Sequence, residues 1–207
     1  MRASAYEFAA RADARVESLS GADYRSHDGA AKCLLEEVLP LSRLGLYLKE
    51  PGLQVEVEAY ENNGPSDGRV SITGYRAEVI DVQIVCDYSY EESLRAELLN
   101  RDGVAPGSGP IHRERRSGAI VATTMAEGID EQFQRTAQDL IRLLRQKSLR
   151  RTGRQALLIA FDAMTLQRGY GWRPLYAALT REGGLSGSGF DTVYLFNGAT
   201  SEIQRAV

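Results

Sequence analysis

The sequence predicts an α/β fold in which a central mixed β-sheet is flanked by helices. Residues 53–60 alternate between apolar and polar side chains, as in a strand with one buried face. Residues 79–85 are almost continuously apolar, as in a strand buried on both faces. The C-terminal half alternates helical segments with short apolar runs, which favours helices packed on a mixed sheet.

The N-terminal half is predicted to hold two helices and three strands. The Ala-rich residues 3–18 form a short helix within an N-terminal helical extension over residues 1–27. Asp28 is the predicted cap of a second helix at 30–46, which opens a single α/β domain over residues 28–207. The strands are expected at 53–60, 69–73 and 79–85.

The C-terminal half contributes the rest of the predicted sheet and its covering helices. A Gly-, Pro- and Arg-rich stretch at 103–118 is expected to be a surface loop. The longest helix is predicted at 130–149, because its apolar residues recur on one side of a helical wheel. The remaining elements are predicted helices at 91–100 and 173–181 and strands at 119–123, 156–161 and 190–196.

Bulk composition limits the class of protein. The chain has 207 residues, of which 43% are hydrophobic, enough to bury a sizeable core. Its formal net charge is −3, so any contact with nucleic acid has to come from a local basic patch. No apolar run approaches the ~20 residues of a membrane span, and the N-terminus has no signal core. Cys33 and Cys86 are expected to be buried thiols, which fits a reducing cytoplasm.

Acidic and amide side chains fall on two of the predicted strands. Asp67 comes off a turn into a strand. Asp81 and Gln83 are two residues apart and therefore share one face of the next strand. A carboxylate within an apolar strand is costly to bury unless it is paired or binds a metal ion. Because Mg²⁺ needs only one or two carboxylates together with a phosphate, we expect Asp67 and Asp81 to converge on a divalent metal ion.

The order of elements over residues 28–100 resembles the core of the PD-(D/E)xK nuclease superfamily, also called the restriction-endonuclease-like fold. In this resemblance Asp67 of Pro65-Ser66-Asp67 matches the first acid, with one additional residue after the proline. Asp81 matches the second acid, and Gln83 stands where the family has a lysine. Glu37, at the edge of the apolar stripe of its helix, matches an acid that some members carry in the first core helix.

The resemblance implies hydrolysis of phosphodiester bonds that depends on Mg²⁺ or Mn²⁺, with DNA as the substrate and a homodimer as a further expectation. Asp67, Asp81 and Glu37 would bind the metal, and Gln83 would orient the attacking water. A lysine would also stabilise negative charge on the phosphoryl group, which a neutral glutamine cannot do. Lys147, near the end of the longest helix, is a candidate substitute for that charge.

Two basic segments are candidates for contact with DNA phosphates. Arg113, Arg115 and Arg116 lie in the predicted loop, and Lys147 lies among the arginines that end the longest helix. Each of these residues also has a simpler interpretation. The loop cluster fits an inert solvated segment, and Lys147 fits a cation at a helix C-terminus.

The acids also allow simpler interpretations. Asp67 fits a residue that caps a turn, and Asp81 fits a solvent-facing acid on an edge strand. The alternative function is accordingly a nuclease-fold protein that has lost catalysis and binds nucleic acid or a protein partner. A third alternative is an unrelated α/β binding module, in which the spacing of the acids arises by chance.

Overall fold

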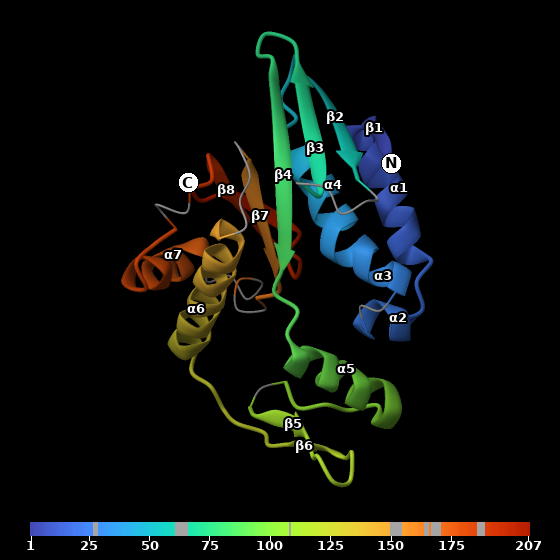
Figure 1. The fold of residues 1–207 in the computed structure, drawn as a ribbon, viewed down its shortest axis with the longest axis vertical. Helices are drawn as coiled ribbons and strands as arrows, with labels where there is room; N and C mark the ends of the chain where they lie inside the picture. The colour runs from blue at the N-terminus through green and yellow to red at the C-terminus, as the bar shows by residue number, and fades with distance from the viewer. Residues whose placement is uncertain are drawn as a thin grey trace.

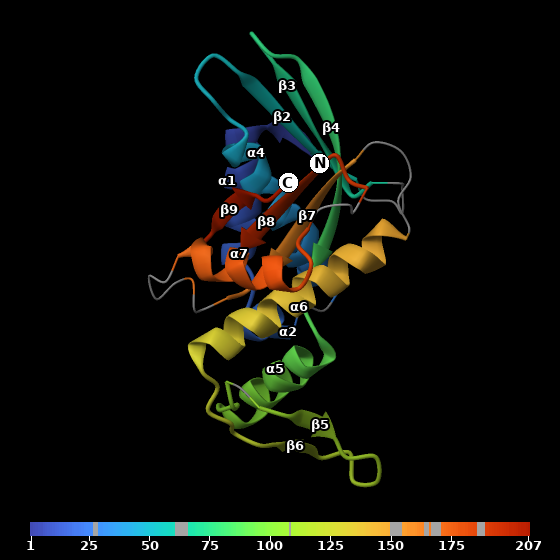
Figure 2. The same ribbon diagram turned by 90° about the vertical axis from the view of Figure 1, so that its left-hand side faces the viewer.

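The computed structural model describes residues 1–26, 29–60, 66–107, 109–149, 155–163, 166, 171–185 and 189–207, and it confirms the predicted α/β class. Among these residues the main sheet has seven strands (Figures 1 and 2). Their spatial order is β1 (Arg2–Ser4), β2 (Gln54–Ala59), β3 (Gly68–Thr73), β4 (Glu78–Cys86), β7 (Ala156–Phe161), β8 (Thr192–Asn197) and β9 (Glu202–Arg205). The pairs from β1 to β4 are antiparallel, the pairs from β4 to β8 are parallel, and β9 returns antiparallel to β8. The sheet is therefore mixed, as predicted.

Helices cover both faces of this sheet (Figures 1 and 2). They are α1 (Ala5–Glu17), α2 (Gly21–Ser26), α3 (Gly29–Cys33), the π-helix η1 (Leu34–Val38), α4 (Leu39–Tyr47), α5 (Tyr90–Asp102), α6 (Ile129–Ser148) and α7 (Trp172–Arg181). One core lies between the sheet and α1, η1 and α4, and a second lies between the sheet and α6 and α7.

Successive side chains of β7 point to opposite faces of the sheet and therefore into different cores. Leu158 and Ala160 pack into the first core, whereas Leu157 and Ile159 pack into the second. All six residues of β7 are buried, which is why the strand has no polar face in the sequence. This central position makes β7 the scaffold for the elements on either side.

The N-terminal segment, set apart by the sequence prediction as a helical extension, contributes both a strand and a helix to the main layers. Strand β1 pairs with β2 and extends the sheet. Phe8 and Ala12 of α1 are fully buried in the first core. The short strands β1 and β9 have no counterpart in the sequence prediction, because three or four residues are too few to show a period.

The helix predicted at 30–46 is confirmed in position but is not uniform. Its span is divided into α3, η1 and α4, with the π-helical turn in the middle. Leu41 and Leu44 are fully buried against the sheet, as their spacing predicts. The predicted cap Asp28 lies outside the described residues.

A small module is inserted between β4 and α6. It consists of α5 and a hairpin of β5 (Ile111–Arg113) and β6 (Ile120–Ala122), within the stretch predicted as loop and strand. Leu94, Leu98 and Ile111 form its own small core. Figures 1 and 2 place the hairpin at the end of the molecule remote from β3.

Two further expectations concern membranes and thiols. None of the helices in the described part of the chain is both long enough and apolar enough to cross a bilayer.

The prediction that both thiols are buried is wrong for Cys33, which is exposed, whereas Cys86 is half-buried.

The central role of β7 predicts an unequal response to two leucine truncations. Leu158 is fully buried and Leu149 is 89% exposed. We expect Leu158→Ala to lower the free energy of unfolding by about 2–4 kcal/mol, because the lost methyl groups leave a cavity. The control Leu149→Ala should change it by less than about 0.5 kcal/mol. Urea denaturation followed by circular dichroism measures both, and equal losses would contradict this placement of β7.

Candidate functional site

The candidate site lies where β3 begins, and its central residue is Asp67. The Asp67 N–H donates to the Val82 carbonyl oxygen at 2.9 Å, and the Tyr60 N–H donates to the Asp67 carbonyl oxygen at 3.0 Å. Asp67 Oδ2 accepts a hydrogen bond from the Ile84 N–H at 2.6 Å. The side chain thus satisfies a β4 backbone donor just before β3 starts, and its position is fixed by both neighbouring strands.

Helix α6 brings a cation to this carboxylate. Lys147 Nζ lies 4.0 Å from Asp67 Oδ2, and the two side chains are 29% and 31% exposed. Leu143 and Leu144, one turn earlier, anchor the helix in the second core. An ion pair at this exposure contributes about 0–1 kcal/mol to stability. Its interest is that it puts a positive charge beside the Asp67 carboxylate.

The π-helix η1 supplies a second carboxylate. Burial raises the pKa of Glu37 above its ordinary value, and the negative charge of Asp67 raises it further. The Cys33 thiol, which lies 3.6 Å from Glu37 Oε2, and the Lys147 ammonium act in the opposite direction. Glu37 therefore senses the charges of both Asp67 and Lys147. π-Helical turns occur frequently at functional sites, and this one carries Glu37.

Gln83 lies on β4 between the two residues that hydrogen-bond to Asp67. Its side chain is buried, with 8% exposure. It is in register with Leu157 of β7, which packs against α6 and α7. Gln83 therefore faces the layer that also carries Lys147.

Asp81 lies on the strand next to Asp67, as predicted, but its carboxylate is engaged elsewhere. Arg69 is its partner in the β3–β4 register, and Arg69 Nε donates to Asp81 Oδ1 at 2.8 Å. Across the described residues, no three His, Cys, Asp or Glu side chains are grouped so as to hold a metal ion. The structure therefore brings Asp67 together with Lys147 and Glu37, and it pairs Asp81 with Arg69.

The donor set at Asp67 fits a hard divalent cation that shares its shell with a ligand. Carboxylate oxygens are what Mg²⁺ prefers, and one or two suffice when phosphate and water complete the coordination. A cation between Asp67 and Glu37 would relieve the repulsion that raises the pKa of Glu37. We therefore take Asp67 and Glu37 as the residues able to hold such an ion.

The loop arginines lie away from this site. Arg113 ends β5, where its guanidinium contacts Glu97 and donates to the Gly118 carbonyl oxygen at 3.0 Å. Arg115 and Arg116 are exposed in the turn of the hairpin. Because the hairpin lies far from β3 in both views, these arginines are not brought beside Asp67 (Figures 1 and 2).

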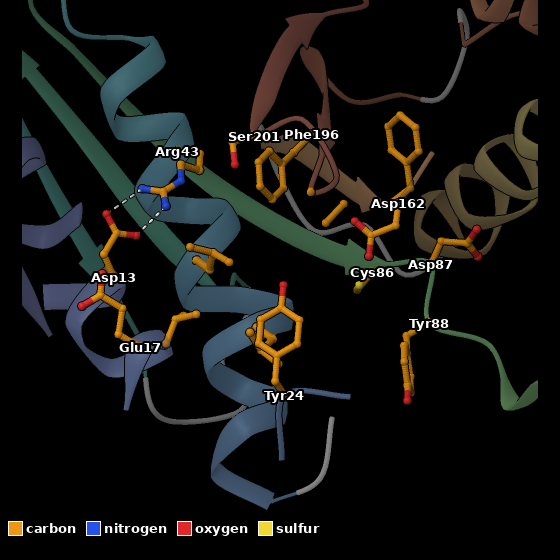
Figure 3. A pocket seen from close by; sticks show the side chains of 16 residues that line it. Asp13, Glu17, Tyr24, Arg43, Cys86, Asp87, Tyr88, Asp162, Phe196 and Ser201 are labelled. Carbon is orange, nitrogen blue, oxygen red and sulfur yellow. Dashed lines mark hydrogen bonds and ion pairs between the residues drawn. The ribbon is translucent and has the colours of Figure 1, made fainter. Parts of the chain in front are cut away.

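A cavity that sequence reasoning missed lies at the carboxyl ends of the parallel strands, and we call it the strand-end cavity (Figure 3). Its volume is about 350 Å³. Asp87 follows β4 directly, Asp162 follows β7 and Gly198 follows β8, and all three line it. An acid directly after a buried apolar strand was the signal available in the sequence, since the carboxyl ends of parallel strands are where α/β proteins bind ligands.

The pKa of the Asp87 carboxyl lies well above its ordinary value. Burial raises the pKa of Asp87 to about 6, the Asp139 carboxylate adds to this, and the Arg142 guanidinium opposes it. Figure 3 shows its carboxylate turned toward α6 rather than into the cavity. Between its ordinary value near ~4 and about 6, the folded chain holds a proton that the unfolded chain has released. The Asp87 carboxyl therefore lowers the free energy of unfolding as the pH rises from ~4 to about 6.

This penalty predicts a stabilising substitution with a defined pH dependence. Asp87→Asn should raise the free energy of unfolding at pH 7.5 by on the order of 2 kcal/mol, and the gain should shrink toward zero near pH 4. Urea denaturation across this pH range measures the difference. The control Asp191→Asn removes an exposed carboxylate at the opposite end of β8 and should show no such trend. A gain that does not depend on pH would contradict the assignment to Asp87.

Comparison with known proteins adds no relative: no family model, no curated protein and no solved structure matches the chain.

Proposed function

We propose that this chain is a divalent-metal-dependent phosphodiesterase that acts on DNA, built on a restriction-endonuclease-like core. One observation carries the proposal, the approach of Lys147 Nζ to within 4.0 Å of Asp67 Oδ2 beside Glu37. The sequence resemblance lacked an amine where Gln83 stands, and α6 supplies one from a distant part of the chain. Carboxylates that hold a metal ion, with an adjacent amine, can activate water and stabilise charge during cleavage of a phosphodiester.

The arrangement of elements supports the same proposal. The helical span from α3 to α4 leads into β2, and Asp67 then precedes β3, which is followed by β4 with Asp81 and Gln83. Helices follow, and β7 then joins β4 in parallel. This order supports the resemblance, and Asp67 directly precedes the strand that pairs with the Asp81-bearing β4.

Each side chain of the site has a role that follows from its position. Asp67 and Glu37 would hold Mg²⁺ or Mn²⁺, which activates water and neutralises charge on phosphate oxygens. The Lys147 ammonium would stabilise the negative charge that develops on the phosphoryl group. Gln83 can orient groups through hydrogen bonds but adds no charge. Arg69, held by Asp81 and 42% exposed, is placed to contact a neighbouring backbone phosphate.

A second candidate function has its own supporting observation. Because Arg69 occupies Asp81, the second acid of the resemblance is not available in this arrangement. A chain that had lost catalysis would keep Arg69 and Lys147 as contacts for phosphates and would bind DNA without cutting it. A homodimer remains compatible with either function.

Cleavage of plasmid DNA tests the proposal with three variants. Asp67→Asn should lower the single-turnover rate by roughly 10³-fold while the protein stays folded, because the Asn oxygen can still accept from the Ile84 N–H. Lys147→Gln should lower the rate by roughly 10²-fold. Arg145→Gln, which removes an exposed cation from the same helix end, should change it by less than about 5-fold.

The possible results separate the two functions. Wild-type protein that binds DNA in a filter assay but leaves it uncut with either metal would support the binding module. Cleavage that is unaffected by Asp67→Asn would rule out this site.

Binding of Mn²⁺, followed by calorimetry, tests the ligand assignment without requiring activity. Wild-type protein should bind Mn²⁺, and Asp67→Asn should weaken the affinity by at least about 10-fold. Asp81→Asn should weaken it by less than about 3-fold, since the Asp81 carboxylate is held by Arg69. An equal loss in both variants would show instead that Arg69 releases Asp81 when the ion binds.

A further inference from the structure

We propose that the β5–β6 hairpin is an arm that binds the phosphate backbone of duplex DNA away from the cleavage site. This inference rests on the proposed function, because it states how the same substrate is held. The hairpin belongs to the module inserted between β4 and α6, which has a small core of its own. We call residues 114–118, which join β5 to β6, the hairpin tip; they include Arg115 and Arg116.

Backbone hydrogen bonds hold the hairpin tip in a defined turn. The Glu114 N–H donates to the Ala119 carbonyl oxygen at 2.8 Å, and the Gly118 N–H donates to the Glu114 carbonyl oxygen at 2.9 Å. Gly118 has a φ of 72°, a conformation that glycine adopts at little cost. The turn therefore presents Arg115 and Arg116 from a backbone that does not have to be ordered when a ligand binds.

The two arginines of the hairpin tip are not paired with other side chains. Both are exposed, and within the described part of the chain neither side chain forms an ion pair or a hydrogen bond. Glu114 is the one acid of the tip, and its carboxylate accepts a hydrogen bond from the Ser117 hydroxyl. Two arginines less one glutamate leave the tip with one net positive charge. Phosphate oxygens that bind both guanidiniums would relieve the repulsion between them.

The acids of α5 have their own partners within the module. All four form ion pairs with arginines: Glu91 and Glu92 with Arg95, Asp102 with Arg101, and Glu97 with Arg113. Because Arg95 serves two glutamates, one negative charge remains, in the first turn of α5 and not on the hairpin. The module therefore separates its charges, and the excess of positive charge lies at the hairpin tip.

The position of the hairpin tip allows one duplex to contact both the arm and the cleavage site. The hairpin extends beyond α5 at one end of the molecule (Figures 1 and 2). In Figure 2 the tip and the C-terminal end of α6, which carries Lys147, project to the same side of the molecule. Duplex DNA is stiff over ~150 base pairs, so it can pass both as a straight rod. The arm thus binds phosphates at a distance from the bond that is cut.

The experiment measures binding of a duplex to the full chain without divalent metal, by fluorescence anisotropy at several salt concentrations. The double variant Arg115→Gln/Arg116→Gln should bind a duplex of roughly 40 base pairs roughly 10-fold more weakly than wild type near ~0.1 M salt. The slope of log K against log salt should become shallower by about 2, because two phosphate contacts are lost.

The control is the charge-matched double variant Arg11→Gln/Arg15→Gln. It removes two exposed arginines from α1, which lies on the opposite side of the molecule from the hairpin tip in Figure 2. Because this variant loses the same net charge but no contact of the arm, its affinity should stay within about 3-fold of wild type. Circular dichroism verifies that both variants are folded.

Three results would overturn the arm. The first is wild-type protein that does not bind the duplex, or a tip variant that binds it as wild type does. The second is an equal loss in the control variant, which would show that only net charge matters. The third is tighter binding to vesicles of phosphatidylserine and phosphatidylcholine than to DNA, lost in the tip variant, which would assign the tip to a membrane surface.

These binding measurements separate the arm from the phosphodiesterase. Weaker binding by the tip variant, together with plasmid DNA that stays uncut, would retain the arm and reject the phosphodiesterase. Cleavage that requires Asp67, together with unchanged binding by the tip variant, would reject the arm alone.

Discussion

The hydrogen bond from the Ile84 N–H to the Asp67 carboxylate is the contact on which the candidate site depends. It extends the pairing of β3 with β4 beyond the first residue of β3, using a side chain in place of a backbone carbonyl. The carboxylate is therefore held at the sheet itself and not on a mobile stem. Lys147 from one layer and Glu37 from the other approach a group whose position is already set.

This arrangement combines a structural and a chemical role in one group. Asp67 Oδ2 accepts from the backbone and is also the oxygen nearest Lys147 Nζ, so the carboxylate joins β4 to α6. A single strand-end acid commonly caps a turn, and by itself it would carry no functional meaning. The approach of an amine and of a second, partly buried acid distinguishes Asp67 from such a residue. Asp81 shows the opposite case, since Arg69 neutralises it across the β3–β4 pair.

Long periodic segments made the architecture predictable, whereas the site depended on information that a sequence does not contain. The apolar runs that became β4 and β7, and the stripe that became α6, fixed the layers. The pairing of Asp81 with Arg69 follows from the strand register, which the turn between the strands decides. Lys147 was a candidate amine from the sequence, but its distance from Asp67 depends on the packing of α6, which the sequence does not give. Strand β1 was too short to be recognised, and the acids of the strand-end cavity follow strands whose parallel order was unknown.

The π-helical turn η1 places two consecutive glutamates in different surroundings. The charge of Glu37 couples to Asp67, whereas that of Glu36 couples to Cys86 at the strand-end cavity. A π-turn corresponds to one residue inserted into an α-helix. Removing one residue from it would restore the α-helical phase and rotate the two flanking helical segments by about 100° relative to each other. Such a shortening is therefore the smallest change that would turn Glu37 away from Asp67 and Glu36 away from Cys86 at once, with no alteration of either strand.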